Sequence, residues 1–305
     1  MYYCDMKILL TFLSLLFIST TTAQSFATSD APVNPEGLLK YHKDHFMLKG
    51  PVKKVILYSK IKRSKSLKQI ESDYLNSTIT IVRGYEYPKG KTYTFDRDGY
   101  LLTETNGDND YVKTYNYNEK NQLVSIDTKY EDEDNPKKRN YISDSNGNIN
   151  RVVTNYAYDD YEYNGKNQLI KYLDSYNESK GGSKGVTTYT YNNSSQVITE
   201  SIEKVSGRMI INTFITYSYK KLEPQKWLVT ENTKRTLKDP QLGNKTKEYK
   251  SQMVYTNGVL TVADYGVDEN RYKFTTDRFD NVITYENATD DSKINSYIKK
   301  EINYW

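Results

Sequence analysis

Few side chains in this sequence could carry out catalysis. His42 and His45 are the only histidines, and the one cysteine, Cys4, precedes an apolar N-terminal run. The two histidines could share one face of a helix as half of a metal site, but a metal site needs more converging ligands than a pair. The sequence motifs of serine hydrolases, zinc proteases and phosphate-binding loops are absent. The sequence therefore predicts no catalytic site, no metal site and no cofactor.

Carboxylates are the only remaining groups that could act as catalytic acids and bases. Paired acids hydrolyse glycosides when they lie at a defined separation, which a sequence does not reveal. The acidic run at 131–134 is predicted to be a solvated hairpin tip. "DRDG" and "NGDND" resemble fragments of calcium loops, but neither continues to the Glu that completes such a loop. A glycosidase-like enzyme with paired carboxylates stays open as an alternative, and facing acids in a concave pocket would favour it.

Tyrosine supplies the most suitable binding chemistry. The chain has 31 Tyr, and aromatic rings beside Asn, Asp, Gln and Lys suit stacking on sugars and hydrogen bonding to their hydroxyls. Most of these Tyr recur at a fixed spacing, which favours a place in a packed core. The predicted ligand-binding residues are Tyr outside that spacing, with the densest patch in "NYAYDDYEY": Tyr85, Tyr87, Tyr130, Tyr156, Tyr158 and Tyr176.

A ten-residue pattern predicts the elements that position these residues. It reads "YTFDRDGYLL" at 93–102 and returns as "YNYNEKNQLV", "YISDSNGNIN", "YEYNGKNQLI", "YTYNNSSQVI" and, at 274–283, "FTTDRFDNVI". Asp or Asn at position four suits the first corner of a type I turn, and Gly or Asn at position seven suits a left-handed residue. Each unit is therefore predicted to be a β-hairpin with a three-residue loop and a bulge.

Alternation along these strands predicts one buried face. Position three should lie across from position nine and position one across from position eleven, so the aromatic rings would form a ladder in the core. Position ten is mostly aliphatic and falls on the opposite face, so either the sheet curls over it or it marks a contact surface. The predicted fold is all-β: residues 47–305 form a single domain, an antiparallel meander of tandem hairpins in a curled, elongated or partly closed sheet.

The pattern Tyr-x-Tyr-Asp-x-x-Gly-x-Leu resembles the YD repeat of the RHS family. "YTFDRDGYLL" differs only by Phe at the second aromatic position, and the resemblance is clear over residues 90–200 and faint over 210–305. It implies a scaffold of β-hairpins without chemistry of its own, similar to small exported RHS-repeat proteins of Bacteroidetes-type bacteria that are sometimes described as sugar-binding. The expected function is non-enzymatic binding or structure. A protein–protein module, such as an adhesion or immunity factor, is the alternative.

The N-terminal residues predict export. Met6 and Lys7 precede an apolar run at 8–18 and small residues up to Ala23, which is the plan of a secretory signal peptide over residues 1–23. Residues 24–46 lack a strand pattern and are predicted as a linker, in which "EGLLKYHKDHF" is compatible with one short helix. No later segment approaches the ~20 apolar residues of a spanning helix. An outer-membrane barrel is set aside because Trp305, Asn303 and Glu301 share one face of the final strand, whereas a lipid-facing row should be apolar. No membrane span is therefore expected.

The even balance of charges argues against one class of partner, nucleic acid. Lys and Arg number 43 against 39 Asp and Glu, and the two signs are interleaved along the chain. Nucleic acid is not an expected partner, because phosphate binding needs a concentrated basic face. The expected partner is a glycan or another protein, met in the periplasm, at the cell surface or after secretion. The oligomeric state is left open.

Overall fold

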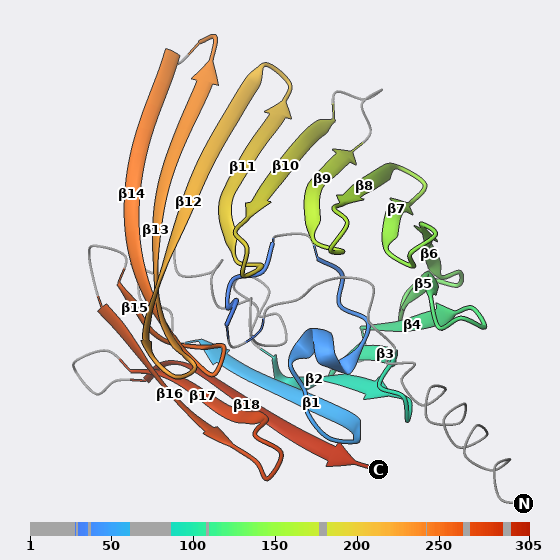
Figure 1. The fold of residues 1–305 in the computed structure, drawn as a ribbon. Helices are drawn as coiled ribbons and strands as arrows, with labels where there is room; N and C mark the ends of the chain where they lie inside the picture. Colours follow the sequence, from blue (N-terminus) through green and yellow to red (C-terminus); the bar gives the residue numbers. More distant parts are fainter. Residues whose placement is uncertain are drawn as a thin grey trace, which may run out of the picture.

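The strands of this chain close on themselves into a barrel (Figure 1). The computed structural model describes residues 28, 30–35, 38–61, 87–107, 110–176, 182–241, 243–264, 269–288 and 294–305. Each of its 18 strands pairs antiparallel with its neighbours in sequence, and the first pairs with the last. The elements are η1 (Lys43–Phe46), β1 (Val52–Ile61), β2 (Tyr87–Phe95), β3 (Leu101–Asn106), β4 (Tyr111–Tyr117), β5 (Leu123–Tyr130), β6 (Lys137–Ser143), β7 (Ile149–Val153), β8 (Ala157–Tyr163), β9 (Leu169–Tyr176), β10 (Ser183–Tyr191), β11 (Val197–Ser206), β12 (Met209–Glu223), β13 (Lys226–Asp239), β14 (Gly243–Thr256), β15 (Val259–Asp264), β16 (Glu269–Thr276), β17 (Val282–Ala288) and β18 (Ile294–Tyr304).

The pairing of β1 with β18 completes the ring. Its register runs from Val52 opposite Tyr304 to Ile61 opposite Ser296. The prediction of an all-β antiparallel meander of hairpins is confirmed, whereas the prediction of a curled or partly closed sheet is corrected to a closed one. The physical reason is that both strands that close the ring lie outside the ten-residue pattern, so the pattern alone did not show that the two ends meet.

The six patterned turns have the predicted geometry. In the first, the Asp96 carboxylate accepts hydrogen bonds from the backbone amides of Gly99 and Tyr100, both at 2.8 Å. In the other five turns, the position-four Asp or Asn likewise accepts from backbone amides two and four residues on. Position seven has a positive φ in all six: Gly99, Asn121, Gly147, Asn167, Ser195 and Asp280.

The predicted register is correct at one pair and wrong at the next. Phe95 lies opposite Leu101, as expected for positions three and nine, but Tyr93 lies opposite Glu104 and not Thr103. Leu102, at position ten, is the extra residue of a β-bulge, so every pair beyond it shifts by one. The position-ten residues of the other five units are skipped in the same way. The aliphatic position-ten stripe is therefore a row of bulge residues.

The aromatic ladder forms the core on the inner face of the barrel. Position one is buried in five units, with exposed fractions from 2% at Tyr93 to 8% at Tyr115. Position nine is equally buried, since Leu101, Leu123 and Ile149 have exposed fractions of 2% or less. The outer face carries polar side chains in cross-strand ion pairs, such as Arg151 with Asp160 at 2.5 Å. The alternation predicted from the sequence therefore separates an apolar inner wall from a polar outer wall.

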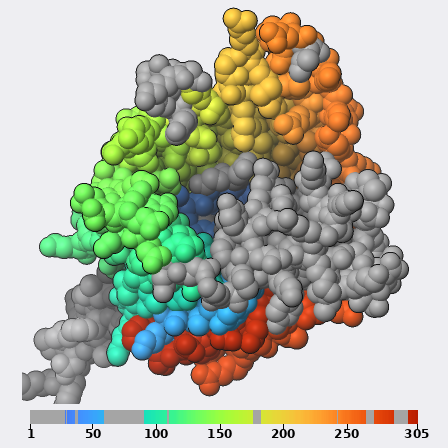
Figure 2. Space-filling model, turned by 180° about the vertical axis from the view of Figure 1, so that it is seen from behind, coloured from blue at the N-terminus to red at the C-terminus, as the bar shows by residue number. Residues whose placement is uncertain are grey.

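The described residues between 28 and 50, here called the N-terminal plug, lie inside the ring near the patterned turns (Figure 1). The Gln196 side chain donates to the Asp30 carbonyl at 2.6 Å, and the Asn281 carboxamide oxygen accepts from the Lys49 amide at 2.6 Å. The Phe46 ring packs against Phe95 at 5.9 Å between centroids. Figure 2 shows a hollow in the opposite view, with blue residues of the N-terminal part at its floor. The plug thus connects turns from distant parts of the ring.

Three strands project beyond the rest of the barrel. β12, β13 and β14 contain 15, 14 and 14 residues, and they extend at the top of Figure 1. β15 pairs only with residues 252–256 of β14, so residues 243–251 of β14 have β13 as their one partner among the described strands. Within the described part of the chain, no helix is long and apolar enough to cross a membrane.

Candidate functional site

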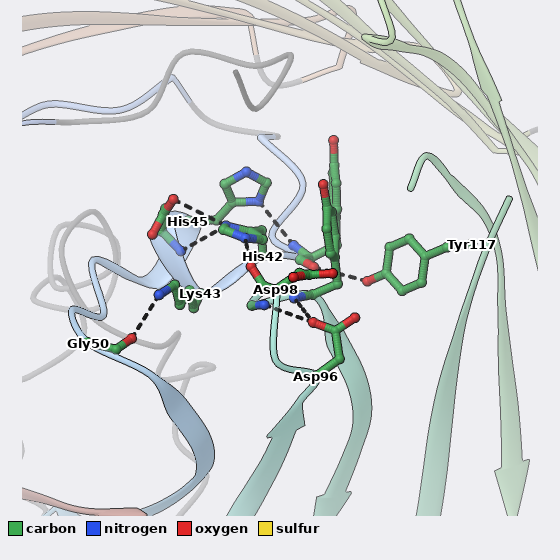
Figure 3. A network of polar contacts seen from close by, with 11 residues as sticks. His42, Lys43, His45, Gly50, Asp96, Asp98 and Tyr117 are labelled. Atoms are coloured by element: carbon green, nitrogen blue, oxygen red, sulfur yellow. Dashed lines mark hydrogen bonds and ion pairs between the residues drawn. The ribbon is translucent and has the colours of Figure 1, made fainter. Parts of the chain in front are cut away.

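The two histidines belong to the packing of the plug. His42 hydrogen-bonds through Nε2 to the Asp98 carbonyl at 3.0 Å, and its Nδ1 accepts from the Asp44 amide (Figure 3). His45 Nδ1 accepts from the Tyr41 amide at 3.2 Å, and burial lowers the pKa of His45 to about 3. Both rings therefore accept hydrogen bonds from backbone amides of the plug. Among the described residues, no three or more His, Cys, Asp or Glu side chains converge on one point.

Three of the sequence-predicted tyrosines lie on the neighbouring strands β5–β8 and the loops between them, and the Lys137 side chain is close to both Tyr130 and Tyr156. Tyr130, Tyr156 and Tyr158 are exposed, with fractions of 39%, 65% and 38%. The Lys137 ammonium lies over the Tyr130 ring, whereas the Arg151 guanidinium lies over the Tyr158 ring on the outer wall. Tyr87 and Tyr176 lie in strands β2 and β9, and Tyr85 falls outside the described residues.

A depression of about 460 Å³ lies on the projecting strands β12–β14. The Phe214 ring stands on it with an exposed fraction of 47%, whereas Tyr249 lies opposite Thr233, so that its ring points to the inner face of the sheet. The strand register sets Phe214 in one row with Lys234 and Glu248 on the outer face. The remaining lining residues are Thr216, Asn232, Thr233 and Lys250.

The depression combines aromatic surface with hydrogen-bonding groups. Its one carboxylate, Glu248, is held by the Lys234 ammonium at 3.2 Å. Asn232 and Thr216 add both donors and acceptors, and the exposed Phe214 ring offers flat apolar surface. A single ion-paired carboxylate is not the pair of acids that glycosidases use.

A pair of acids does face each other elsewhere, on the inner wall. Asp159 of β8 lies directly opposite Asp174 of β9. Burial raises the pKa of Asp159 to about 6, and the neighbouring Asp174 carboxylate adds to the rise, partly through a side-chain hydrogen bond. Carboxyl groups in hydrogen-bond contact are closer than the roughly 5–5.5 Å or 6.5–9.5 Å that glycosidases use. The pair therefore lacks the separation that a glycosidase would need.

A second charged cluster is built into the wall beneath the plug. The Glu104 carboxylate contacts the ammonium groups of Lys91 and Lys113, each at 2.9 Å, and accepts from the Tyr111 and Tyr115 hydroxyls. Burial alone would raise the pKa of Glu104, but the two lysines outweigh it and lower the pKa to about 2. Glu104 is thus a fully partnered structural anion. The ten-residue pattern does not predict this cluster, because the bulge at Leu102 determines that Glu104 lies opposite Tyr93.

Comparisons with known proteins identify no family for this chain. No protein-family model matches the chain, and no curated protein matches it. A crystal structure of a porin-like protein from Bacteroides uniformis ATCC 8492 is similar over 84% of this chain and 98% of that one, with 11% sequence identity and a TM-score of 0.41. No residue role is transferred from it.

Two predictions from the sequence are wrong. The resemblance to the YD repeat does not place the chain in the RHS family: no family model matches, and the hairpins close into one 18-stranded ring. The exclusion of a membrane span rested on the lack of long apolar helices and on the polar residues of the final strand. A closed antiparallel barrel is the architecture that crosses membranes with strands, because all its backbone groups pair within the ring.

Proposed function

We propose that this chain is an exported, non-enzymatic barrel protein of the cell envelope that binds carbohydrate in the depression on β12–β14. The observation that supports this most directly is the exposure of Phe214 beside Asn232 and the Lys234–Glu248 ion pair. Sugar rings stack on exposed aromatic rings, while their hydroxyls bond to amide and charged groups.

The test is a glycan-array binding assay on the purified exported chain beside a Phe214→Ala variant. We expect saturable binding to one class of glycan, reduced about tenfold or more in the variant, because one stacked ring contributes on the order of 1–3 kcal/mol. A Tyr156→Ala, Tyr158→Ala double variant is the matched control, since it removes two exposed rings outside the depression. Loss of binding in the control and not in Phe214→Ala would move the site to the tyrosines predicted from the sequence.

A protein partner is the second candidate, and a specific feature favours it. Residues 243–251 of β14 pair with no described strand on their free side, and their backbone groups could accept an added strand from another protein. A folded, β-rich protein that binds nothing on the array would count against the carbohydrate proposal. Pull-down with the wild type and with a Thr246→Pro variant, which interrupts this edge, would then test the alternative.

A further inference from the structure

Four cations gather on the inner face of the projecting strands, the face opposite the outer-face row of Phe214, Lys234 and Glu248. Strand register sets Lys204 of β11 in one row with Ile211, Leu237 and Lys245 on β12, β13 and β14. In the next row, Arg235 of β13 lies directly opposite Lys247 of β14. All four cationic residues are exposed. We call this set, Lys204, Arg235, Lys245 and Lys247, the cationic face.

The charges of this face are not balanced within the structure. Like charges directly opposite each other on neighbouring strands destabilise a sheet, and Arg235 and Lys247 are such a pair. No ion pair between described residues involves any of the four. On the outer face of the same strands, by contrast, Lys234 is paired with Glu248 at 3.2 Å. On the inner face of these two strands, Arg235, Lys245 and Lys247 lie beside the carboxylates of Glu231 and Asp239, so cations are in excess by one.

Protection of a free strand edge explains only part of this set. Lysines on an exposed edge discourage pairing with another chain, and this accounts for Lys245 and Lys247 on the free side of β14. It does not account for Lys204 or Arg235, because β11 and β13 are hydrogen-bonded to strands on both sides.

Gly185 opens space beside the cationic face. It lies between Asp174 and Lys204 in the same inner row. Its φ is outside the left-handed region, and an added Cβ would meet nothing closer than the Lys204 Cγ at 3.7 Å. Neither backbone conformation nor crowding requires glycine here. A glycine in the interior of a strand then leaves room for a ligand to approach the backbone.

We propose that the cationic face binds an anionic polysaccharide. Arg235 presents two parallel donors to a carboxylate or sulfate, and Lys204, Lys245 and Lys247 supply point charges around it. Ile211 and Leu237, between Lys204 and Lys245, give an apolar surface to the sugar ring. This site goes beyond the proposed function and does not depend on it, because the row of Phe214, Lys234 and Glu248 lies on the other face of the sheet.

The test is a titration of the purified chain with polygalacturonate, with neutral dextran as the uncharged polymer. An Arg235→Gln, Lys247→Gln variant should bind polygalacturonate about tenfold more weakly and show a flatter dependence of affinity on salt, because fewer counterions are released. The matched control is Lys220→Gln, Lys238→Gln, which removes the same charge from the outer faces of β12 and β13. It should bind like the wild type, and so should Phe214→Ala.

Three outcomes would overturn the proposal. Equal weakening in both double variants would mean that net charge alone drives binding. Equal affinity for double-stranded DNA with the same dependence on Arg235 and Lys247 would mean general attraction of polyanions. Absence of binding at low salt would remove the site altogether.

A single Lys247→Glu variant separates binding from edge protection. It replaces the like-charge pair with an opposite-charge pair, so the melting temperature should rise while polygalacturonate binding falls. If Lys247 only protects the edge from pairing, the Lys247→Glu variant should stay soluble and bind polygalacturonate as the wild type does. That result would contradict the proposal.

Discussion

Side chains alternate between the two faces both in the patterned hairpins and in the projecting strands β12–β14, but the aromatic residues are covered in the first region and exposed in the second. In the hairpins, the inward aromatic residues at position one are covered, and Tyr93 and Tyr189 have exposed fractions of 2% and 3%. On the projecting strands, Phe214 and Tyr249 are 47% and 41% exposed. The difference shows that regular repetition in this chain builds the wall, whereas departures from it create surfaces that are free to bind.

Strand length explains why the two regions differ. An Asp or Asn turn ends each patterned hairpin after strands of five to ten residues, so the turns align at one rim where the plug covers them. β12 and β13 run 15 and 14 residues, and at the end away from the patterned turns β13 continues to Asp239, opposite Gly243 of β14. Their far halves therefore extend past the plug and the aromatic core.

The largest effect should come from exchanging one ring in each region for alanine. Phe95→Ala empties a site that is 1% exposed beside Phe46, and we expect it to lower the free energy of unfolding by about 3–5 kcal/mol. Phe214→Ala should change it by less than about 0.5 kcal/mol, since its ring is half in water. Urea unfolding measures both. Similar losses of unfolding free energy in the two variants would contradict the distinction between a packed core ring and an exposed surface ring.

The second largest loss of stability should come from replacing Glu104, the buried anion of the wall. Glu104→Gln leaves Lys91, with a side chain only 8% exposed, without its charged partner, and we expect a loss of about 3 kcal/mol at pH 7. Burial lowers the pKa of Lys91 even beside Glu104, so part of the gain from the low pKa of Glu104 is offset by burying the lysine.

The dependence on pH tests the sign of this effect. Because the folded-state pKa of Glu104 is about 2, below its ordinary value, its contribution is complete above about pH 4.5 and is lost as the pH falls toward 2. The variant should therefore approach the wild type in acid. The exposed pair Lys171 and Glu162 is the control, and Glu162→Gln should cost less than about 1 kcal/mol.

The sequence predicts the wall better than the binding surfaces, for a physical reason. Turn chemistry is local: Asp96 bonds to amides within four residues, so the pattern determines the hairpin and its bulge. Closure of the ring and the partners of Glu104 depend on contacts between distant strands, and they have no local signature. Phe214 shares its face of β12 with the polar residues Asn212, Thr216 and Ser218, and no local pattern marks this one ring as part of a depression.

Gly99 tests the junction between a patterned turn and the plug. Its φ is +99°, and a Cβ there would lie 2.8 Å from both His42 Nε2 and Lys43 Cγ. Gly99→Ala should lower the free energy of unfolding by about 1–3 kcal/mol. Gly165 occupies another patterned turn with open space around it and no left-handed φ, so Gly165→Ala should be neutral or slightly stabilising. Equal losses in both variants, measured by urea unfolding, would show that the plug is not held at this turn.

The smallest effect should come from Asp159, where a patterned hairpin carries charge on the inner wall. Its pKa is about 6 when folded, above its ordinary value, so the stability it contributes is present in acid and is lost as the pH rises through 6. Asp159→Asn removes the repulsion with Asp174, and the melting temperature should rise by about 1–2 °C at pH 8 but not at pH 4. Asp160→Asn breaks the outward pair with Arg151 and should not stabilise at either pH. If Asp159→Asn instead lowers the melting temperature at pH 8, the ionised pair is compensated by neighbouring cations, and the inner wall tolerates charge on the hairpins as it does on the cationic face.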